Sequence, residues 1–189
     1  NKITATIGGY DGIHIGHNRI ISKVVQKAKE NNSKSALITF KPLPKIFFAR
    51  KNFELLTIYK KIEILKELNV DYMILLRFND SLISMSSKDF IEEILIKKLN
   101  ISSLTVGHDF KFGKNQSGSV SDLQDYAHKG FFTLNVEEKH SIAGERISSS
   151  SIRDYIMQNN FEKASKMLGR PYTVSGKIIH GDKSCLLYT

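Results

Sequence analysis

The chain has 189 residues, 41% of them hydrophobic and 25% charged, which is the balance of a globular domain with a sizeable core. No apolar run approaches the roughly 20 residues that span a bilayer, and the first residues do not resemble a signal peptide, so we expect a cytoplasmic protein without a membrane partner. The single cysteine, Cys185, excludes an internal disulfide and a cysteine metal cluster, and the net charge of +9 comes from dispersed lysines, which favours a solvated surface over a nucleic-acid interface.

The beginning of the chain predicts a strand, a helix and a second strand. Residues 3–7 are β-branched and alternating, and they end at Gly8-Gly9. Residues 15–29 place Ile21, Val24 and Ala28 at helical spacing, and residues 35–40 form a second β-rich run. A strand, a helix and a strand in succession predict a βαβ unit and therefore a parallel sheet.

The alternation continues along the chain and predicts an α/β fold with an open parallel sheet. We expect helices at 60–68, 87–99, 120–128, 149–158 and 161–168, and strands at 71–78, 103–106 and 131–136. Gly169-Arg170-Pro171 is typical of a linker, and residues 172–179 are β-like. We therefore divide the chain into a domain over 1–168 and the start of a second unit over 169–189.

The loop between the first strand and the first helix carries the residues best suited to chemistry. It reads Gly8-Gly9-Tyr10-Asp11-Gly12-Ile13-His14-Ile15-Gly16-His17. Nucleotides bind at this edge of an open parallel sheet, where glycines allow close approach and a helix N-terminus attracts phosphate. His14 and His17 can both face such an anion, donate hydrogen bonds to it and, if protonated, add positive charge. Glycines that only turn the chain, and histidines that only cap a helix, are the simpler alternative.

This loop resembles the H-x-G-H motif of the nucleotidyltransferase superfamily, whose fold is a Rossmann-like open parallel sheet. Class I aminoacyl-tRNA synthetases share the motif, but Ser84-Met85-Ser86-Ser87-Lys88 lacks the leading lysine of their second motif, and the chain is too short for a synthetase.

Further segments resemble, in order, the adenylyltransferase module of the bifunctional riboflavin kinase/FMN adenylyltransferase (FAD synthetase) family. The matching segments are Gly9–His17, Thr39–Pro44, Leu56-Thr57, Met85–Ile91, Val106–Gly113, Ile147–Arg153, Gly169–Tyr172 and Gly176–Asp182. The resemblance implies transfer of AMP from ATP to FMN, giving FAD and pyrophosphate, with Mg²⁺ accompanying ATP and no dedicated protein metal site. It also implies that residues 169–189 begin a β-barrel kinase module, and riboflavin kinase activity requires the rest of that module. We favour a truncated bifunctional protein over the alternative of a stand-alone adenylyltransferase with a vestigial strand.

The resemblance assigns roles to particular residues. The implied catalytic residues are His14, His17, Ser149 and Arg153, and the implied substrate-binding residues are Gly8, Gly9, Tyr10, Asp11, Gly16, Asp109, Arg146, Ser148 and Ser150. Asp109 also suits a simple turn, and the serines suit helix capping as well as phosphate binding. The loop from Phe40 to Pro44, with Phe47 and Phe48 beyond it, suits either an isoalloxazine ring or ordinary core packing.

Three positions depart from the family pattern. Leu43 replaces a histidine, Tyr10 replaces a phenylalanine, and Ser151 replaces a residue that is often arginine. The first departure puts the acceptor in question. Another small-molecule nucleotidyltransferase, acting on pantetheine phosphate, nicotinamide mononucleotide or glycerol phosphate, is therefore the nearest alternative, and a nucleic-acid-binding module is the alternative from a different class.

Overall fold

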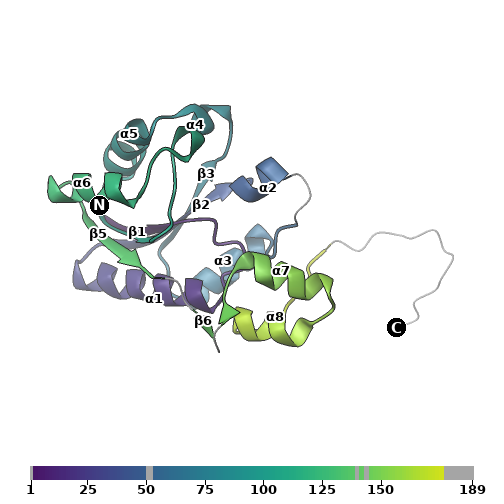
Figure 1. Ribbon diagram of the computed structural model, residues 1–189. Coiled ribbons are helices and arrows are strands. Elements are labelled where there is room, and N and C mark those ends of the chain that lie inside the picture. Colours follow the sequence, from purple (N-terminus) through teal and green to yellow (C-terminus); the bar gives the residue numbers. More distant parts are fainter. Residues whose placement is uncertain (1, 50–52, 139–140, 143–144, 177–189) are drawn as a thin grey trace.

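The computed structural model describes the chain except residues 1, 50–52, 139–140, 143–144 and 177–189. Its centre is a five-stranded, entirely parallel sheet, which confirms the α/β fold (Figure 1). The strands are β1 (Ile3–Ile7), β2 (Lys34–Lys41), β3 (Tyr72–Arg77), β4 (Ile101–Gly107) and β5 (Thr133–Glu137), in the spatial order β3-β2-β1-β4-β5.

Helices cover both faces of the sheet, as its burial requires (Figure 1). One face carries α1 (Ile15–Glu30) and α3 (Ile58–Glu67). The other carries α4 (Asp80–Ser84), α5 (Ser87–Asp89), η1 (Phe90–Lys98) and α6 (Val120–His128). The element order therefore places one helical layer on each side of a single sheet.

Strand periodicity explains why the two faces have different cores. Ala5 and Ile7 of β1 belong to the core beneath η1 and α6, where Leu95 and Leu123 are fully buried. The intervening Thr6 is equally buried on the α1 side, and its hydroxyl donates to the Thr105 carbonyl at 2.8 Å. The Thr6 hydroxyl is thus satisfied within the protein by the neighbouring strand β4.

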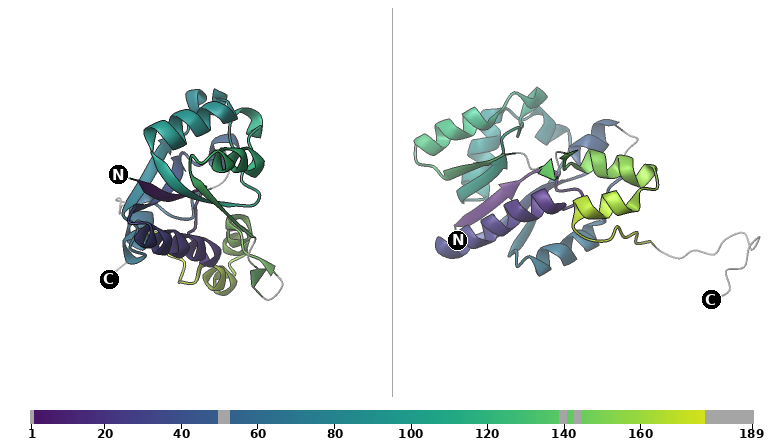
Figure 2. Two further views of the ribbon diagram at one scale, coloured as in Figure 1. Left: turned by 90° about the vertical axis from the view of Figure 1, so that its left-hand side faces the viewer. Right: turned by 60° about the horizontal axis from the view of Figure 1, so that its bottom comes forward.

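A helical hairpin, α7 (Ser149–Met157) and α8 (Phe161–Leu168), completes the domain. Its core, centred on Ile152 and Ala164, also receives Leu55. Figures 1 and 2 show the hairpin beside the N-terminal end of α1, and a two-stranded unit, β6 (Ser141–Ile142) and β7 (Glu145–Arg146), precedes it. The hairpin therefore lies at the same end of the molecule as the loop that follows β1.

The structure corrects several expectations. The helix expected over 87–99 forms as one α-helical turn followed by the π-helical η1. The helices α2 (Pro44–Ala49) and α4 and the 3₁₀ turn η2 (Lys114–Gln116) occupy segments for which no helix was predicted. Residues 172–176 form no strand, because no neighbouring strand among the described residues pairs with them, and residues 177–179 lie outside the described part. Within the described residues, no helix combines the length and hydrophobicity needed to cross a bilayer.

Candidate active site

A cleft of about 870 Å³ opens at the carboxyl ends of β1 and β4, the two strands between which the chain reverses its direction across the sheet. Such a switch point is where open α/β sheets bind ligands, because the loops after the two strands run to opposite faces. Gly8 follows β1 directly, and Gly107 ends β4. The topology alone therefore creates a hollow between these two loops.

Most of the predicted site residues lie in this cleft. Those that line it are Gly8, Gly9, Tyr10, Asp11, His14, Gly16, His17, Asp109, Ser148, Ser149 and Arg153. Ser150 is exposed on α7 and does not line the cleft, because the first turn of that helix directs it to solvent. Arg146 lies in β7, and its side chain is outside the described part.

The loop after β1 is held to the sheet by specific hydrogen bonds. The Gly8 N–H donates to the Ile38 carbonyl at 3.1 Å, and the Thr39 hydroxyl donates to the Gly9 carbonyl at 2.9 Å. A Cβ at Gly8 would come within 3.1 Å of the Tyr10 ring, so the glycine permits this packing. The Tyr10 ring packs on His17 with 4.7 Å between centroids, and its hydroxyl is hydrogen-bonded to Thr6.

Asp11 fixes the middle of the loop through a buried ion pair with Arg153 of α7. The other carboxylate oxygen of Asp11 accepts the Leu55 N–H at 2.9 Å. Burial raises the pKa of the Asp11 carboxyl, while Arg153 opposes that shift. The remaining Arg153 nitrogens donate to carbonyls, Nε to Phe53 at 2.9 Å and Nη1 to Ser149 at 3.3 Å. Arg153 therefore lines the cleft but directs donors from all three nitrogens into the protein.

His14 and His17 form a stacked pair at the start of α1, with 3.6 Å between ring centroids and 14° between ring planes. His14 caps the helix, because its Nδ1 accepts the His17 N–H at 3.3 Å. Its proton must then reside on Nε2. His17 Nδ1 is buried and has no hydrogen-bond partner within the described part of the chain.

Both imidazoles are held in the neutral form. Burial, followed by the charge of Arg170, lowers the pKa of His14 from 6.5 to about 4. Burial, followed by His14, Lys61 and Arg170, lowers the pKa of His17 well below its usual value. The histidines thus enter the site as neutral hydrogen-bonding groups, and the extra positive charge considered in the sequence analysis is absent at neutral pH.

The N-terminus of α7 lines the cleft with polar groups, as the start of α1 does. Ser148 caps this helix by accepting the Ser151 N–H at 3.0 Å, and Ser149 occupies the first turn. Ser149 and Gly16 lie at the N-termini of α7 and α1, and both line the cleft. Two helix N-termini, with their positive dipole ends, therefore border one space.

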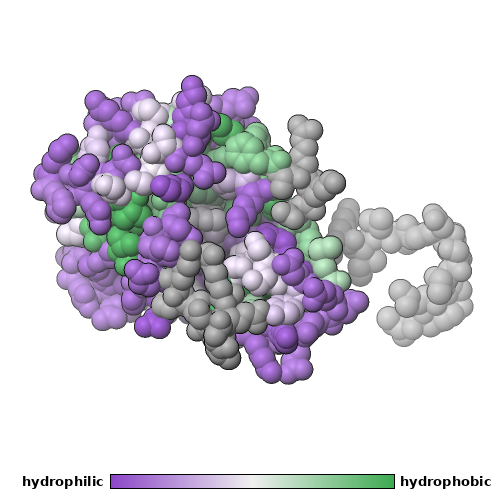
Figure 3. All heavy atoms as spheres, viewed as in Figure 1, coloured by the Kyte–Doolittle hydropathy of each residue, from purple (hydrophilic) through white to green (hydrophobic). Residues whose placement is uncertain are grey.

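An aromatic wall forms another side of the cleft. Phe78 stands at its centre, with ring centroids 5.9 Å from Phe40, 5.3 Å from Phe47 and 5.8 Å from Phe48, all edge to face. Phe40, Phe48 and Phe78 line the cleft, and Phe48 is 63% exposed. Figure 3 shows the corresponding hydrophobic surface over α2 at the upper right. Leu43, at the family's histidine position, lies in the same wall and is 4% exposed.

Sequence reasoning did not select several residues that line the cleft. Glu137 ends β5 and Glu138 follows it, so their place at the carboxyl edge of a parallel strand was a usable signal. His108 precedes Asp109, and its buried Nδ1 has no partner in the described part of the chain. Leu82 and Ile83 come from α4, which is too short to give a helical periodicity.

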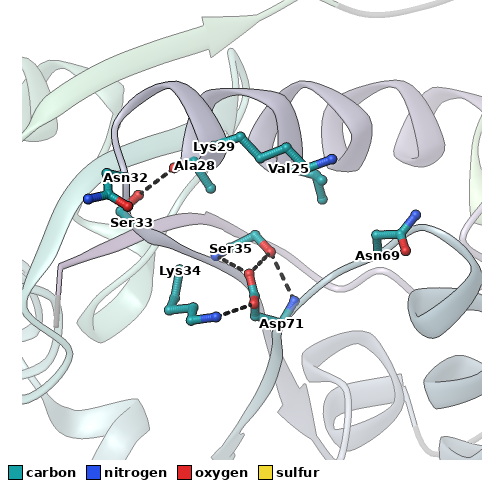
Figure 4. A pocket seen from close by; sticks show the side chains of 9 residues that line it. All are labelled: Val25, Ala28, Lys29, Asn32, Ser33, Lys34, Ser35, Asn69 and Asp71. Carbon is teal, nitrogen blue, oxygen red and sulfur yellow. Dashed lines mark hydrogen bonds and ion pairs between the residues drawn. The ribbon is translucent and has the colours of Figure 1, made fainter.

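A smaller hollow of about 280 Å³ lies at the opposite edge of the sheet, where β2 begins (Figure 4). Its acidic group, Asp71, accepts the Ser35 N–H at 2.9 Å, the Ser35 hydroxyl at 2.6 Å and Lys34 Nζ at 2.9 Å. These bonds, the Ser35 hydroxyl foremost, lower the pKa of Asp71 to about 2. Since its carboxylate already joins the start of β2 to the start of β3, this hollow is structural.

Comparisons with known proteins agree with the resemblance found in the sequence. The FAD synthetase family profile matches residues 1–151. A bifunctional riboflavin kinase/FMN adenylyltransferase from Buchnera aphidicola subsp. Schizaphis graminum is 38% identical over 183 residues, covering 94% of this chain and 58% of that protein. One from Listeria monocytogenes is 35% identical over 186 residues, covering 97% of this chain and 58% of that protein. The chain thus spans 58% of the length of these relatives.

A solved structure shares the fold. The crystal structure of a protein named as a macrolide-efflux protein, from Streptococcus pneumoniae, superposes with a TM-score of 0.81 at 26% identity, over 96% of this chain and 61% of that chain.

Proposed function

The chain belongs to the FAD synthetase family, and we propose that it transfers AMP from ATP to FMN, giving FAD and pyrophosphate. The observation that carries this proposal is the cleft in which two helix N-termini, with their histidines and serines, face the same space as an aromatic wall. The first feature suits a triphosphate, and the second suits an isoalloxazine ring. FMN, which joins a phosphate to such a ring, matches both.

In this proposal the FMN phosphate attacks the α-phosphorus of ATP and pyrophosphate leaves. His14 donates from Nε2 and His17 from its imidazole N–H to the phosphoryl oxygens on which charge develops. Ser149 and the N–H groups that begin α7 receive the departing pyrophosphate. Such a transfer needs positioning and charge stabilisation, and it needs no nucleophilic side chain.

The role of Arg153 differs from the sequence-based expectation. Its nitrogens donate to Asp11, Phe53 and Ser149, so we assign it to fixing α7 against the loop after β1. It then acts on the phosphates through the position of Ser149, and Asp11 is its partner in the same task. Asp109, two residues beyond β4, is the proposed contact of the ATP sugar or base on the far side of the switch point.

Magnesium would enter with the triphosphate. The described residues contain no group of three or more histidine, cysteine, aspartate or glutamate side chains that could hold a metal ion. Mg²⁺ commonly binds through substrate phosphates and retains several waters, so the cleft fits a magnesium–ATP complex held by its phosphate oxygens. It would neutralise part of the triphosphate charge there.

The proposal is confined to adenylyl transfer, because the chain spans 58% of its relatives and the riboflavin kinase activity in their names belongs to those proteins. ATP is abundant in the cytoplasm, so we place the reaction there. The lysines are dispersed along the sequence, and we propose neither a nucleic-acid nor a membrane partner.

Replacing His17 with alanine tests the proposed chemistry. We expect the kcat of FAD formation in His17→Ala to fall about 10²-fold or more, because a preorganised donor to the developing charge is lost. FAD formation from ATP and FMN is followed by chromatography with flavin fluorescence, and His128→Ala, which removes an exposed imidazole of α6, is the control. Activity of His17→Ala within twofold of the parent protein would exclude this loop from the reaction.

A further inference from the structure

Arg170, which lies just beyond α8, reaches back to the loop that carries the histidines. Its Nη1 donates to the Ile13 carbonyl at 2.7 Å and to the Leu168 carbonyl at 3.2 Å, and its Nη2 donates to the Gly12 carbonyl. Arg170 thus spans two consecutive carbonyls directly before His14. Residue 170 lies outside residues 1–151, which the family profile matches.

The backbone that Arg170 holds is strained. Ile13 is fully buried and has φ +40°, a left-handed conformation that β-branched residues disfavour. Tyr10, earlier in the same loop, has φ +42°. Such conformations persist only where surrounding contacts enforce them. The hydrogen bonds of Arg170 fall on the carbonyl of Ile13 itself and on the carbonyl before it.

The end of α8 also fits closely against the start of α1. Gly169 ends α8 with φ +73°, and a Cβ at this position would lie 2.9 Å from Ile15 Cγ1. A Cβ at Gly12 would lie 3.3 Å from Leu168 Cδ2. The two glycines therefore bring the backbone around Arg170 within hydrogen-bonding reach of the loop.

We propose that Arg170 is a positioning residue of the transfer site, whose guanidinium holds the Gly12 and Ile13 carbonyls so that the chain enters α1 with His14 and His17 stacked toward the cleft. The kinetic part of this inference rests on the proposed adenylyl transfer, whereas the structural part stands on the contacts alone. The segment predicted as a linker thereby supports the loop that carries the two histidines.

The charge of Arg170 acts on the same pair. It is among the groups that lower the pKa of His14 and of His17. A backbone hydrogen bond within His14 raises the pKa of that residue, whereas Lys61, from α3, and His14 both lower the pKa of His17. Removing the guanidinium should therefore raise the pKa of both imidazoles as well as loosen the loop.

Two substitutions separate positioning from simple folding. In Arg170→Gln we expect kcat for FAD formation to fall at least tenfold with little change in KM for ATP, and the imidazole NMR signals of His14 and His17 to shift and titrate at higher pH. In Arg170→Lys we expect a smaller loss of kcat, because an ammonium keeps the charge and donates less well to two carbonyls at once. Lys166→Ala, which removes an exposed cation of α8, should match the parent protein.

The readouts distinguish this inference from the proposed function. A parent protein that forms no FAD contradicts the proposed function. The imidazole signals alone then test whether Arg170 positions His14 and His17. Imidazole signals and kcat in Arg170→Gln that equal those of the parent would overturn the inference. If Arg170→Gln does not fold, parent-like values of both in Arg170→Lys overturn it, and an intermediate kcat with shifted signals supports it.

Discussion

The stacked histidines are neutral because burial and nearby positive charges both disfavour the protonated imidazole. His14 is 7% exposed, and its Nδ1 is occupied by the backbone N–H that it caps. His14 can cap the helix and also bind a phosphate, because capping through Nδ1 fixes the tautomer that leaves Nε2–H available to the phosphate. A residue predicted from a sequence motif thus acquires its protonation state only from the structure around it.

Stability should depend on pH through this pair. The pKa of His14 is 6.5 in the unfolded chain and about 4 in the folded protein, so between these values the unfolded chain binds more protons. The stabilisation is complete above pH 6.5 and is lost as the pH falls toward 4, with a contribution from His14 of up to about 3 kcal/mol. We expect the decrease in Tm over this window to be smaller in His14→Asn.

Thermal unfolding followed by circular dichroism across this pH range provides the check. The control is His128→Asn, which changes an exposed side chain and should keep the slope of the parent protein. A His14→Asn variant with the full slope of the parent would show that His14 does not carry this dependence.

Helix α7 owes its place in the site to contacts with distant segments. Arg153 joins it to Asp11, and its Nε bonds the Phe53 carbonyl. Ile152, on the same helix, is fully buried beside α8. The orientation of the N-terminal end of α7, where Ser149 lies, therefore depends on the Arg153–Asp11 ion pair and on the apolar packing of Ile152.

Breaking the charge pair should be costly. In Asp11→Ala the Arg153 guanidinium remains buried without its carboxylate, and we expect a loss of about 3–5 kcal/mol in the free energy of unfolding. Urea denaturation measures the change. In the matched control, Glu162→Ala, an exposed ion pair with Lys166 is removed, and the loss should be much smaller than in Asp11→Ala. Equal losses in the two variants would contradict a structural role for the buried pair.

For the molecule as a whole, the local hydrophobic pattern of the sequence identified most helices and strands, and tertiary contacts determined how they pack and which side chains they bring together. The five strands of the central sheet and the long helices followed from periodicity, whereas β6 and β7 were not predicted. The family resemblance is confirmed by the family profile and by the relatives. The short helices α2 and α4 were missed because they span too few turns to show a period.

The hydrogen-bond and ion-pair partners of Arg153 and Arg170 were the feature least predictable from the sequence. Arg153 was expected to bind phosphate, yet its ion-pair partner Asp11 lies 142 positions away in sequence. Arg170 was placed in a linker, yet it bonds carbonyls more than 150 positions earlier in the chain. No local pattern encodes such pairings, because they exist only once β1, α7 and α8 have been brought together by the fold.

The most direct test of the central claim is the acceptor requirement of pyrophosphate release. With ATP and Mg²⁺ present, we expect purified protein to release pyrophosphate only when FMN is added, with one FAD formed for each pyrophosphate. Pantetheine phosphate, nicotinamide mononucleotide and glycerol phosphate should give no release above background. Release that requires one of these compounds while FMN gives no FAD would contradict the account.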